Sequence, residues 1–285
     1  MTLQALSSEA IARLPTPKGV ALALLKACRS EDVNLQQIAD LVRTDPALSG
    51  RLLALANSAA SGGRNIVSID EAVSRTGLAA VSQIALAFSL IDQHSSGFCT
   101  NFNYAGFWSQ SLLMAAASRE LGASAQLGSP GELFTVGLFA QVGQLALATT
   151  YPVEYSELLA QGVSRTELLQ REKVIAGIDH LALSVALMAQ WGVPPEYSQP
   201  FGFHDVLPVP GASSDPNLQR RYELAHAAWN VALALANEGV DAVLEAPACL
   251  EATAWLGLDA EQLRIHITEI ESVWRLWLAL ISRNS

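Results

Sequence analysis

Charged residues are scarce in this chain, and positive ones are the scarcest. Only 15% of the 285 residues are charged, and 17 Lys and Arg stand against 27 Asp and Glu, which gives a net charge of −10. Proteins that bind nucleic acids need a cluster of positive side chains to displace counterions from phosphates. The densest basic run here is only Arg220-Arg221. The composition therefore argues against DNA or RNA as a partner.

Cysteine is also rare. Cys28, Cys99 and Cys249 are far apart and show no Cys-x-x-Cys or Cys/His spacing. This pattern excludes a zinc signature and a disulfide framework. It predicts buried, reduced thiols in a cytoplasmic protein.

Long apolar runs and a leader pattern are missing as well. The first 15 residues lack a basic region followed by an apolar core, so we expect no signal peptide. The longest apolar stretches, residues 78–91 and 136–148, contain Ser or Gln. They fall short of the roughly 18 residues that a membrane-spanning helix needs. We therefore expect a soluble, cytoplasmic chain without a membrane span.

Several catalytic motifs are absent. No Walker or Rossmann glycine pattern occurs, and no Gly-x-Ser-x-Gly elbow is present. The sequence therefore gives no support for a nucleophile triad or a phosphate-binding loop.

What the sequence does contain is helical periodicity. Half of it is hydrophobic, with 51% apolar residues, and alternating β patterns are almost absent. Asp45 and Pro46 are typical of an N-cap and the first position of a helix. The pattern predicts an all-α fold, with later helices over residues 107–121, 132–149, 155–161, 164–174, 180–191, 195–199 and 219–237, and a closing helix after Asp259.

Local signals predict the ends of some helices. Ser68 with Glu71, and Asp259 with Gln262, have the spacing of capping boxes. Residues 203–217 are rich in Pro, Gly and Ser and predict a loop or linker before the C-terminal helices.

The five histidines are the remaining candidates for chemistry. Three are expected to be structural or solvated: His94, His226 and His266. His180 follows Asp179 at a helix start, and His204 precedes Asp205 near a helix end, so the two imidazoles could share a site. A catalytic metal, however, needs at least three protein ligands. Structural roles are therefore favoured on the residues alone.

A series of motifs adds a family resemblance. A Leu-Pro-x-Pro start is followed by "DPALSGRLLALANSA" and by Ser-Ile-x-x-Ala-Val. The blocks "FWSQSLLMAAASREL", "ELFTVGLFAQVGQLAL" and "DHLALSVALMAQWGVPPEY" follow in order. Over residues 14–204 the chain resembles the HDOD domain, a bacterial all-helical domain related to the HD phosphohydrolases and the HD-GYP cyclic-di-GMP phosphodiesterases.

The resemblance implies an HD-like orthogonal helical bundle. We expect an HDOD domain over residues 1–205, divided into an N-terminal helical subdomain (residues 1–92) and an HD-like core (residues 93–205). Residues 206–285 are expected to form a linker and C-terminal helices that pack on the core or extend it.

The resemblance also implies that the metal site is degenerate. The HD enzymes read Gly-Leu-Leu-His-Asp-Ile-Gly where this chain has Ala140 and Gln141 in place of the His-Asp pair. Alanine cannot ligate a metal, and glutamine is a neutral amide that cannot act as a base. Of the other ligand positions, only His180 and His204 are retained; the remaining two align with Gln110 (or Ser109) and Asn230. We expect no catalytic residue, no metal and no cofactor.

The glutamines in "GLFAQVGQLAL" leave two interpretations open. Gln141 and Gln144 either form hydrogen bonds inside a former active-site cleft, or face solvent or cap a buried amide. The family signature residues Asp45, Pro46, Asn57 and Ser58 are expected to be structural, starting a helix and then ending it or tying down the following loop.

The resulting functional hypothesis is a non-catalytic signal-transduction module that contacts an unidentified signalling protein. One alternative is a receptor for a nucleotide or cyclic dinucleotide in the degenerate cleft, with Arg119, Arg165 and Arg171 as candidates for phosphate. Another is a residual metal-dependent phosphohydrolase that uses His180 and His204 with Asp205 or His226. The apolar face carrying Trp274 and Trp277 either pairs two copies in a homodimer or faces the core.

Overall fold

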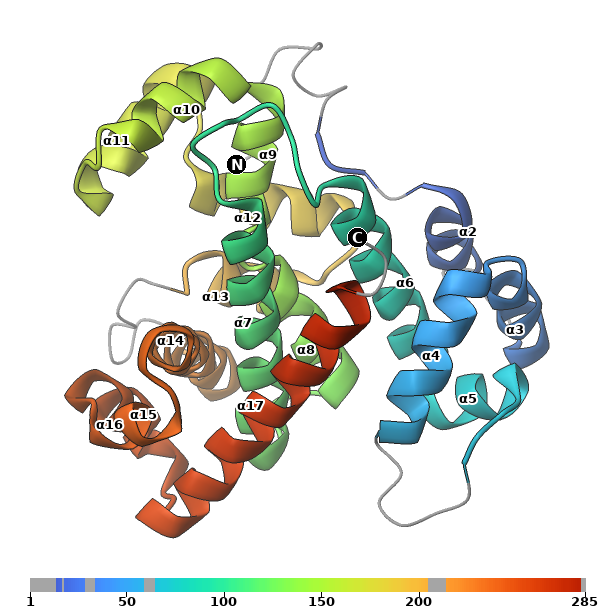
Figure 1. Cartoon of the computed structure of the whole chain (residues 1–285). Helices are drawn as coiled ribbons and strands as arrows, with labels where there is room; N and C mark the ends of the chain where they lie inside the picture. The colour runs from blue at the N-terminus through green and yellow to red at the C-terminus, as the bar shows by residue number, and fades with distance from the viewer. Residues whose placement is uncertain (1–13, 17, 29–33, 59–64, 205–213, 283–285) are drawn as a thin grey trace. The chain divides into compact units, whose positions relative to one another are not determined.

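The structure is a computed structural model that describes residues 14–16, 18–28, 34–58, 65–204 and 214–282. Its regular elements are helices, and no strand occurs within these ranges (Figure 1). The predicted all-α class is confirmed. Ala and Leu at helical spacing account for the all-α class. These residues favour helix, and at that spacing they form an apolar stripe that the fold can bury.

The chain divides into two compact units, here called first and second. Within the described residues, the first consists of Thr16–Gln93 and the end of the last helix from Leu280, and the second consists of residues 14–15 and His94–Ala279. The first contains α2 (Gly19–Ala27), α3 (Leu35–Arg43), α4 (Pro46–Ser58), α5 (Ile69–Thr76) and α6 (Leu78–Gln93). The second contains α7 (Tyr104–Ser124), α8 (Pro130–Phe139), α9 (Val142–Thr150), α10 (Pro152–Ala160), α11 (Arg165–Ala176), α12 (His180–Gln190), α13 (Pro195–Gly202), α14 (Pro216–Glu238), α15 (Val240–Glu245), α16 (Pro247–Thr253), the 3-10 turn η2 (Ala254–Leu256) and α17 (Ala260–Ser282).

In the first unit, α4 begins as the sequence predicts. Pro46 is its first residue, and the Asp45 carboxylate accepts the backbone N–H of Leu48 at 3.0 Å. A proline at this position costs no helical hydrogen bond, and the carboxylate satisfies one of the free N–H groups of the first turn. Asp45 and Pro46 therefore form the start of α4.

Asn57 ties the end of α4 to the chain that follows. Its amide nitrogen donates to the carbonyls of Leu53 and Ile66, both at 2.9 Å, and its amide oxygen accepts the N–H of Ile66 at 2.6 Å. One side chain thus holds both backbone groups of Ile66 against the last turn of α4. Ser58 is the last residue of α4, and its side chain lies outside the described residues.

The predicted capping box at the start of α5 is wrong. Ser68 is the N-cap residue, but its side chain makes no capping hydrogen bond. Instead, its hydroxyl donates at 3.2 Å to the carboxylate of Asp70, which is paired with Arg43 of α3. The charged acceptor that Arg43 holds in place competes with the backbone N–H for the hydroxyl, and this tertiary contact decides the outcome.

The first unit contains a buried guanidinium. Arg51 has only 5% of its surface exposed, and both terminal nitrogens donate to Asp92, at 2.7 and 2.9 Å. The guanidinium carbon also lies 4.2 Å from the centre of the Phe88 ring. The fork of an arginine can satisfy a carboxylate and stack on a ring at once.

In the second unit, α7 runs through the middle with α8 and α14 packed along it (Figure 1). Close packing with α8 requires Gly137, because a Cβ there would lie 2.5 Å from the Ser118 hydroxyl and 2.7 Å from the Met114 carbonyl oxygen. The glycine therefore brings the segment that ends at Phe139 directly onto the central helix.

The C-terminal helices belong to the second unit. The predicted box at the start of α17 is confirmed, because Asp259 accepts the Gln262 N–H at 2.8 Å and Gln262 accepts the Asp259 N–H at 3.0 Å. Trp277 is buried and stacks on Phe134 of α8 with ring centres 4.6 Å apart. Trp277 thus faces the core, which was one of the two interpretations. The sequence did not predict the short helices α15 and α16.

One stretch of the described chain is long and apolar enough for a membrane span. It covers Pro130–Thr150, and 89% of its most apolar window is buried inside the protein. The sequence analysis counted only residues 136–148 as apolar, whereas the stretch that meets the length begins at Pro130. Helices Ile69–Thr76 and Ala80–Gln93 pass the same test only as a pair bent by 109°. For Pro130–Thr150, burial in the core accounts for the composition.

Candidate functional site

The stretch "GLFAQVGQLAL" is not one continuous helix. The sequence predicted a single helix over residues 132–149, but α8 ends at Phe139 and α9 begins at Val142. The break falls on Ala140 and Gln141, the two positions where the resemblance places the metal-binding His-Asp pair. Gln141 has a φ of −105° and a ψ of 9°, outside the helical range.

The break follows from close packing of α9 on α12. The backbone N–H of Gly143 donates to the Ser184 hydroxyl at 2.8 Å, so it does not continue the bonding pattern of α8. A Cβ at this position would collide with the carbonyl oxygen of His180 and would lie 2.9 Å from the Ser184 nitrogen. Gly143 therefore lets the backbone of α9 touch the first turn of α12.

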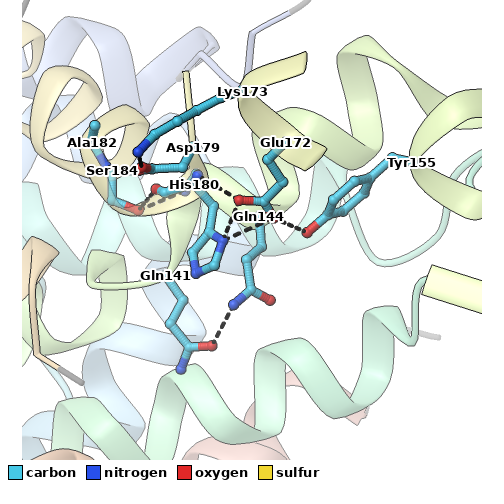
Figure 2. A network of polar contacts seen from close by, with 10 residues as sticks. Gln141, Gln144, Tyr155, Glu172, Lys173, Asp179, His180, Ala182 and Ser184 are labelled. Carbon is cyan, nitrogen blue, oxygen red and sulfur yellow. Dashed lines mark hydrogen bonds and ion pairs between the residues drawn. The ribbon is translucent and has the colours of Figure 1, made fainter. Parts of the chain in front are cut away.

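His180 is the first residue of α12 and is held on two sides. Asp179 caps the helix by accepting the N–H of Ala182 at 2.8 Å. The other oxygen of the Asp179 carboxylate forms an ion pair with Lys173 at 2.9 Å. Figure 2 shows this pair on one side of His180 and Gln141 with Gln144 on the other. Only 3% of the surface of His180 is exposed.

Glu172 of α11 is the main partner of His180. Its carboxylate is completely buried and accepts the His180 backbone N–H at 2.9 Å and the ring Nδ1 at 2.7 and 2.8 Å. The Tyr155 hydroxyl donates to the same carboxylate at 3.1 Å (Figure 2). Because an ionised carboxylate only accepts, Nδ1 must carry a proton. The orientation of the imidazole is thereby fixed, with Nε2 directed away from Glu172.

Burial and the charge of Glu172 both change the pKa of Tyr155. Burial raises the pKa of Tyr155 well above its ordinary value, and the nearby charge of Glu172 and the hydrogen bond to it act in the same direction. The phenol therefore remains a donor at neutral pH. Every described partner of the Glu172 carboxylate is a donor, which is the condition for keeping a charge in an apolar interior.

The two glutamines differ in their surroundings. Gln141 is buried, with 5% of its surface exposed, whereas Gln144 is partly exposed. The Gln144 amide nitrogen is 3.4 Å from the Gln141 oxygen, a weak hydrogen bond (Figure 2). The Gln141 amide nitrogen is buried without a hydrogen-bond partner. Gln141 therefore does not face solvent, and it retains an unused donor in the interior.

A second polar group surrounds His204. Its Nδ1 donates to the Phe201 carbonyl at 2.8 Å, and its ring packs edge-on against Trp229, with centres 4.6 Å apart. The His226 Nδ1 donates to the His204 carbonyl at 3.3 Å, and the Asn230 amide donates to the other ring nitrogen of His226 at 3.2 Å. These bonds tie His226 to the chain around His204 and give it a structural role. Asp205 lies outside the described residues.

The donor set does not fit a catalytic metal. Ala140 is completely buried and offers only a methyl group, and Gln110 of α7 has a buried amide nitrogen without a partner. Within the described part of the chain, no three or more His, Cys, Asp or Glu side chains are grouped so that they could hold a metal ion. Gln141 and Gln144 bond to each other and lie beside the Glu172–His180 pair in Figure 2. Hydrogen bonds join His204, His226 and Asn230 into a second polar group.

Comparison with known families supplies the context for this arrangement. The sequence profile of the HDOD domain matches residues 14–207. The chain belongs to the HDOD domain family. The match covers the motif-bearing blocks that carried the resemblance, together with both polar groups as far as His204.

Solved structures agree with this assignment. The MmoQ response regulator from Methylococcus capsulatus str. Bath is 34% identical, with a TM-score of 0.57, over 89% of this chain and 97% of that one. An HDOD domain protein of unknown function from Geobacter sulfurreducens is 19% identical, with a TM-score of 0.64, over 98% and 94% of the two chains.

Two further relatives are more distant in sequence. A candidate phosphohydrolase from Shewanella amazonensis SB2B shares the fold, with a TM-score of 0.68 and 22% identity over 95% of this chain and 98% of that one. An uncharacterized protein of Treponema pallidum (strain Nichols) is 24% identical over 216 residues, which are 72% of this chain. The HDOD chain spans only 40% of that curated relative's length.

Sequence reasoning missed Glu172 and Tyr155. Glu172 lies between Arg171 and Lys173 and looks like part of a solvated helix face. A signal was nevertheless present, because Glu172 completes a stripe at helical 3/4 spacing whose other members are apolar: Leu168, Leu169, Ile175 and Ala176. A carboxylate inside such a stripe indicates a buried partner.

Proposed function

We propose that this HDOD chain is a non-catalytic signal-transduction module that works by contacting a protein partner. The observation that carries the proposal is the chemistry at the helix break. Ala140 has no donor atom, and Gln141 is a neutral amide that can neither balance the charge of a metal nor activate water as a base.

The architecture around the break supports a retained structural role. Gly143, Ser184 and the Glu172–His180 pair hold α9, α11 and α12 together through contacts that need no metal. The solved relative with the highest identity given above is named as a response regulator, which is consistent with signalling. The fold shared with a candidate phosphohydrolase carries no reaction to this chain, because the ligand residues are what define that chemistry.

One observation favours a second candidate, a receptor for a nucleotide-like ligand. The buried Gln141 amide nitrogen has no partner, and an unused buried donor calls for an acceptor. Cations for phosphate are scarce nearby. Arg171 is engaged by Glu167 at 2.5 Å and by Gln161, and Lys173 is engaged by Asp179. A ligand at Gln141 would therefore be recognised through neutral hydrogen bonds.

The decisive experiment measures metal and turnover in the same sample. The full chain is purified without chelator, its manganese, iron and zinc are determined by elemental mass spectrometry, and hydrolysis of bis(4-nitrophenyl) phosphate is followed with added Mn²⁺. We expect no stoichiometric metal and no hydrolysis above buffer. About one metal per chain, with hydrolysis lost in His180→Ala and His204→Ala but kept in His266→Ala, would overturn the proposal.

The receptor alternative has its own measurement. Thermal unfolding is recorded with ATP, GTP and cyclic di-GMP, because a ligand that binds only the folded state raises the unfolding temperature. A rise that disappears in Gln141→Leu and persists in Gln161→Leu would favour the receptor. No rise with any of the three supports the contact-based function.

A further inference from the structure

Two neighbouring residues of α10 face two different parts of the second unit. Tyr155 donates its hydroxyl to the buried carboxylate of Glu172, which holds His180. Ser156, the next residue, bonds to the loop formed by residues 97–103. Both side chains are buried, with 1% and 6% of their surfaces exposed. A shift of this turn of α10 must therefore displace contacts to Glu172 and to the loop of residues 97–103 at the same time.

Ser156 anchors the loop through several hydrogen bonds. Its hydroxyl is 2.8 Å from the Thr100 hydroxyl and accepts the Asn101 backbone N–H at 3.1 Å. The Asn101 amide also donates to the Ser156 hydroxyl at 2.9 Å and to its carbonyl at 3.1 Å. The loop itself is tightened by the Phe102 N–H, which donates to the Cys99 carbonyl at 3.1 Å.

Apolar contacts reinforce the same connection. Phe102 is buried, and its ring centre lies 6.4 Å from that of Tyr155. Cys99 is completely buried, whereas its neighbour Phe98 is 91% exposed. Phe98 is the most exposed of the large apolar side chains in the described part of the chain. A displacement of the buried anchor at Cys99 would move Phe98, since consecutive Cα atoms are a fixed distance apart.

We propose that α10 couples the buried Glu172–His180 pair to the loop of residues 97–103, so that a change at His180 alters the position of Phe98. If Glu172 turned away, the Tyr155 hydroxyl would be left without a partner in an apolar interior. Relief of that cost requires movement of Tyr155, and Ser156 moves with it. The buried pair and the exposed loop then form two ends of one contiguous network.

The proposed function gives the coupling its purpose, which is to carry a signal to the surface, and the coupling rests on it in no other way. Its test uses the isolated full chain and needs no partner, metal or substrate. Discovery of hydrolysis would refute the proposed function and leave the coupling unaffected, whereas the experiment below can refute the coupling alone.

The experiment is hydrogen exchange of the full chain, measured by mass spectrometry on Tyr155→Phe, Ser156→Ala and the control Tyr197→Phe. The control removes a hydroxyl from another buried tyrosine, which bonds weakly to the Leu127 carbonyl at 3.5 Å. For Tyr155→Phe we expect amides of residues 98–104 to exchange about fivefold faster, the size expected for one lost hydrogen bond. Tyr197→Phe should leave them unchanged.

Coupling is reciprocal, which gives a second readout. Ser156→Ala, which acts directly on the loop, should also speed exchange of the His180 amide, because that N–H is bonded to Glu172. Faster exchange at both ends, with α14 unchanged, supports the proposal. It is overturned if Tyr155→Phe leaves the loop unchanged while Ser156→Ala releases it, or if exchange rises equally throughout α14.

Discussion

The backbone N–H of Gly143 donates to the Ser184 hydroxyl, which in turn donates to the His180 carbonyl at 2.9 Å. This chain of bonds holds the start of α9 against the first turn of α12. The helix break at Ala140 and Gln141 therefore belongs to the packing of two helices and does not depend on metal ligands. The break therefore forms in this chain without a His-Asp pair.

A methyl group at position 143 should not be tolerated. Gly143→Ala would push the backbone of α9 off that of α12, and neither neighbour is the flexible end of a side chain. We expect the free energy of unfolding to fall by about 3 kcal/mol or more. Gly50→Ala is the control, because a Cβ there meets nothing within 4 Å; it should be neutral or stabilising by about 0.5–1 kcal/mol. Urea denaturation followed by circular dichroism measures both, and equal effects would contradict the packing argument.

Asn57 should matter more than its partial exposure indicates. Asn57→Ala removes three hydrogen bonds to Leu53 and Ile66, and we expect a loss of about 2 kcal/mol in the stability of the first unit. Asn237→Ala is matched, since Asn237 makes the same bond to the carbonyl four residues earlier, at 2.8 Å, on an exposed surface. Urea denaturation should show almost no change for the control. A similar loss in both variants would mean that the two bonds to Ile66 contribute nothing.

Arg51 should not be replaceable by lysine. A lysine keeps the charge but loses the two-pronged bond to Asp92 and the stacking on Phe88. We expect Arg51→Lys to cost about 2 kcal/mol. Arg275→Lys is the control, since that exposed arginine pairs with Glu271 at 2.7 Å and should change stability by less than about 0.5 kcal/mol. Thermal unfolding distinguishes the two, and an unaffected Arg51→Lys would refute the prediction.

Ionisation of Tyr155 should lower the free energy of unfolding at alkaline pH. Its folded pKa is raised by burial and then by Glu172, so it favours the folded state fully below the unfolded pKa near 10 and loses that contribution as pH rises above it. Above about pH 10, we expect the free energy of unfolding to fall less steeply with pH in Tyr155→Phe than in the unmodified chain. The two slopes should differ by up to about 1.4 kcal/mol per pH unit. Urea denaturation at several pH values measures the slope. Parallel slopes for the two proteins would show that Tyr155 does not contribute.

The sequence predicts local features of this fold well. Asp45 with Pro46, and Asp259 with Gln262, act at helix starts as expected, because a cap depends on residues three or four positions apart. The capping box at Ser68 fails for the opposite reason. Its hydroxyl is drawn to Asp70, whose position is set by Arg43 from another helix.

The site was only partly predictable for the same physical reason. The family alignment directs attention to Gln141 and His180, but the break in the helix depends on Ser184, which lies more than 40 residues beyond it in sequence. Likewise, nothing adjacent to Glu172 indicates that His180 and Tyr155 surround it. Contacts between distant segments leave at most an indirect trace, such as a charged residue in an apolar stripe.

Glu172 also fixes the register in which α11 packs against its neighbours. Glu172 is completely buried and bonds to His180, whereas its neighbours Arg171 and Lys173 are partly exposed and pair with Glu167 and Asp179. A slip of one residue along the chain turns a helix by about 100° and would bring a cation against an imidazole that needs an acceptor. Docked in any other register, α11 would bury the wrong charge. A leucine at this position could pack equally well in several registers, so the carboxylate contributes uniqueness of structure even where it contributes little stability.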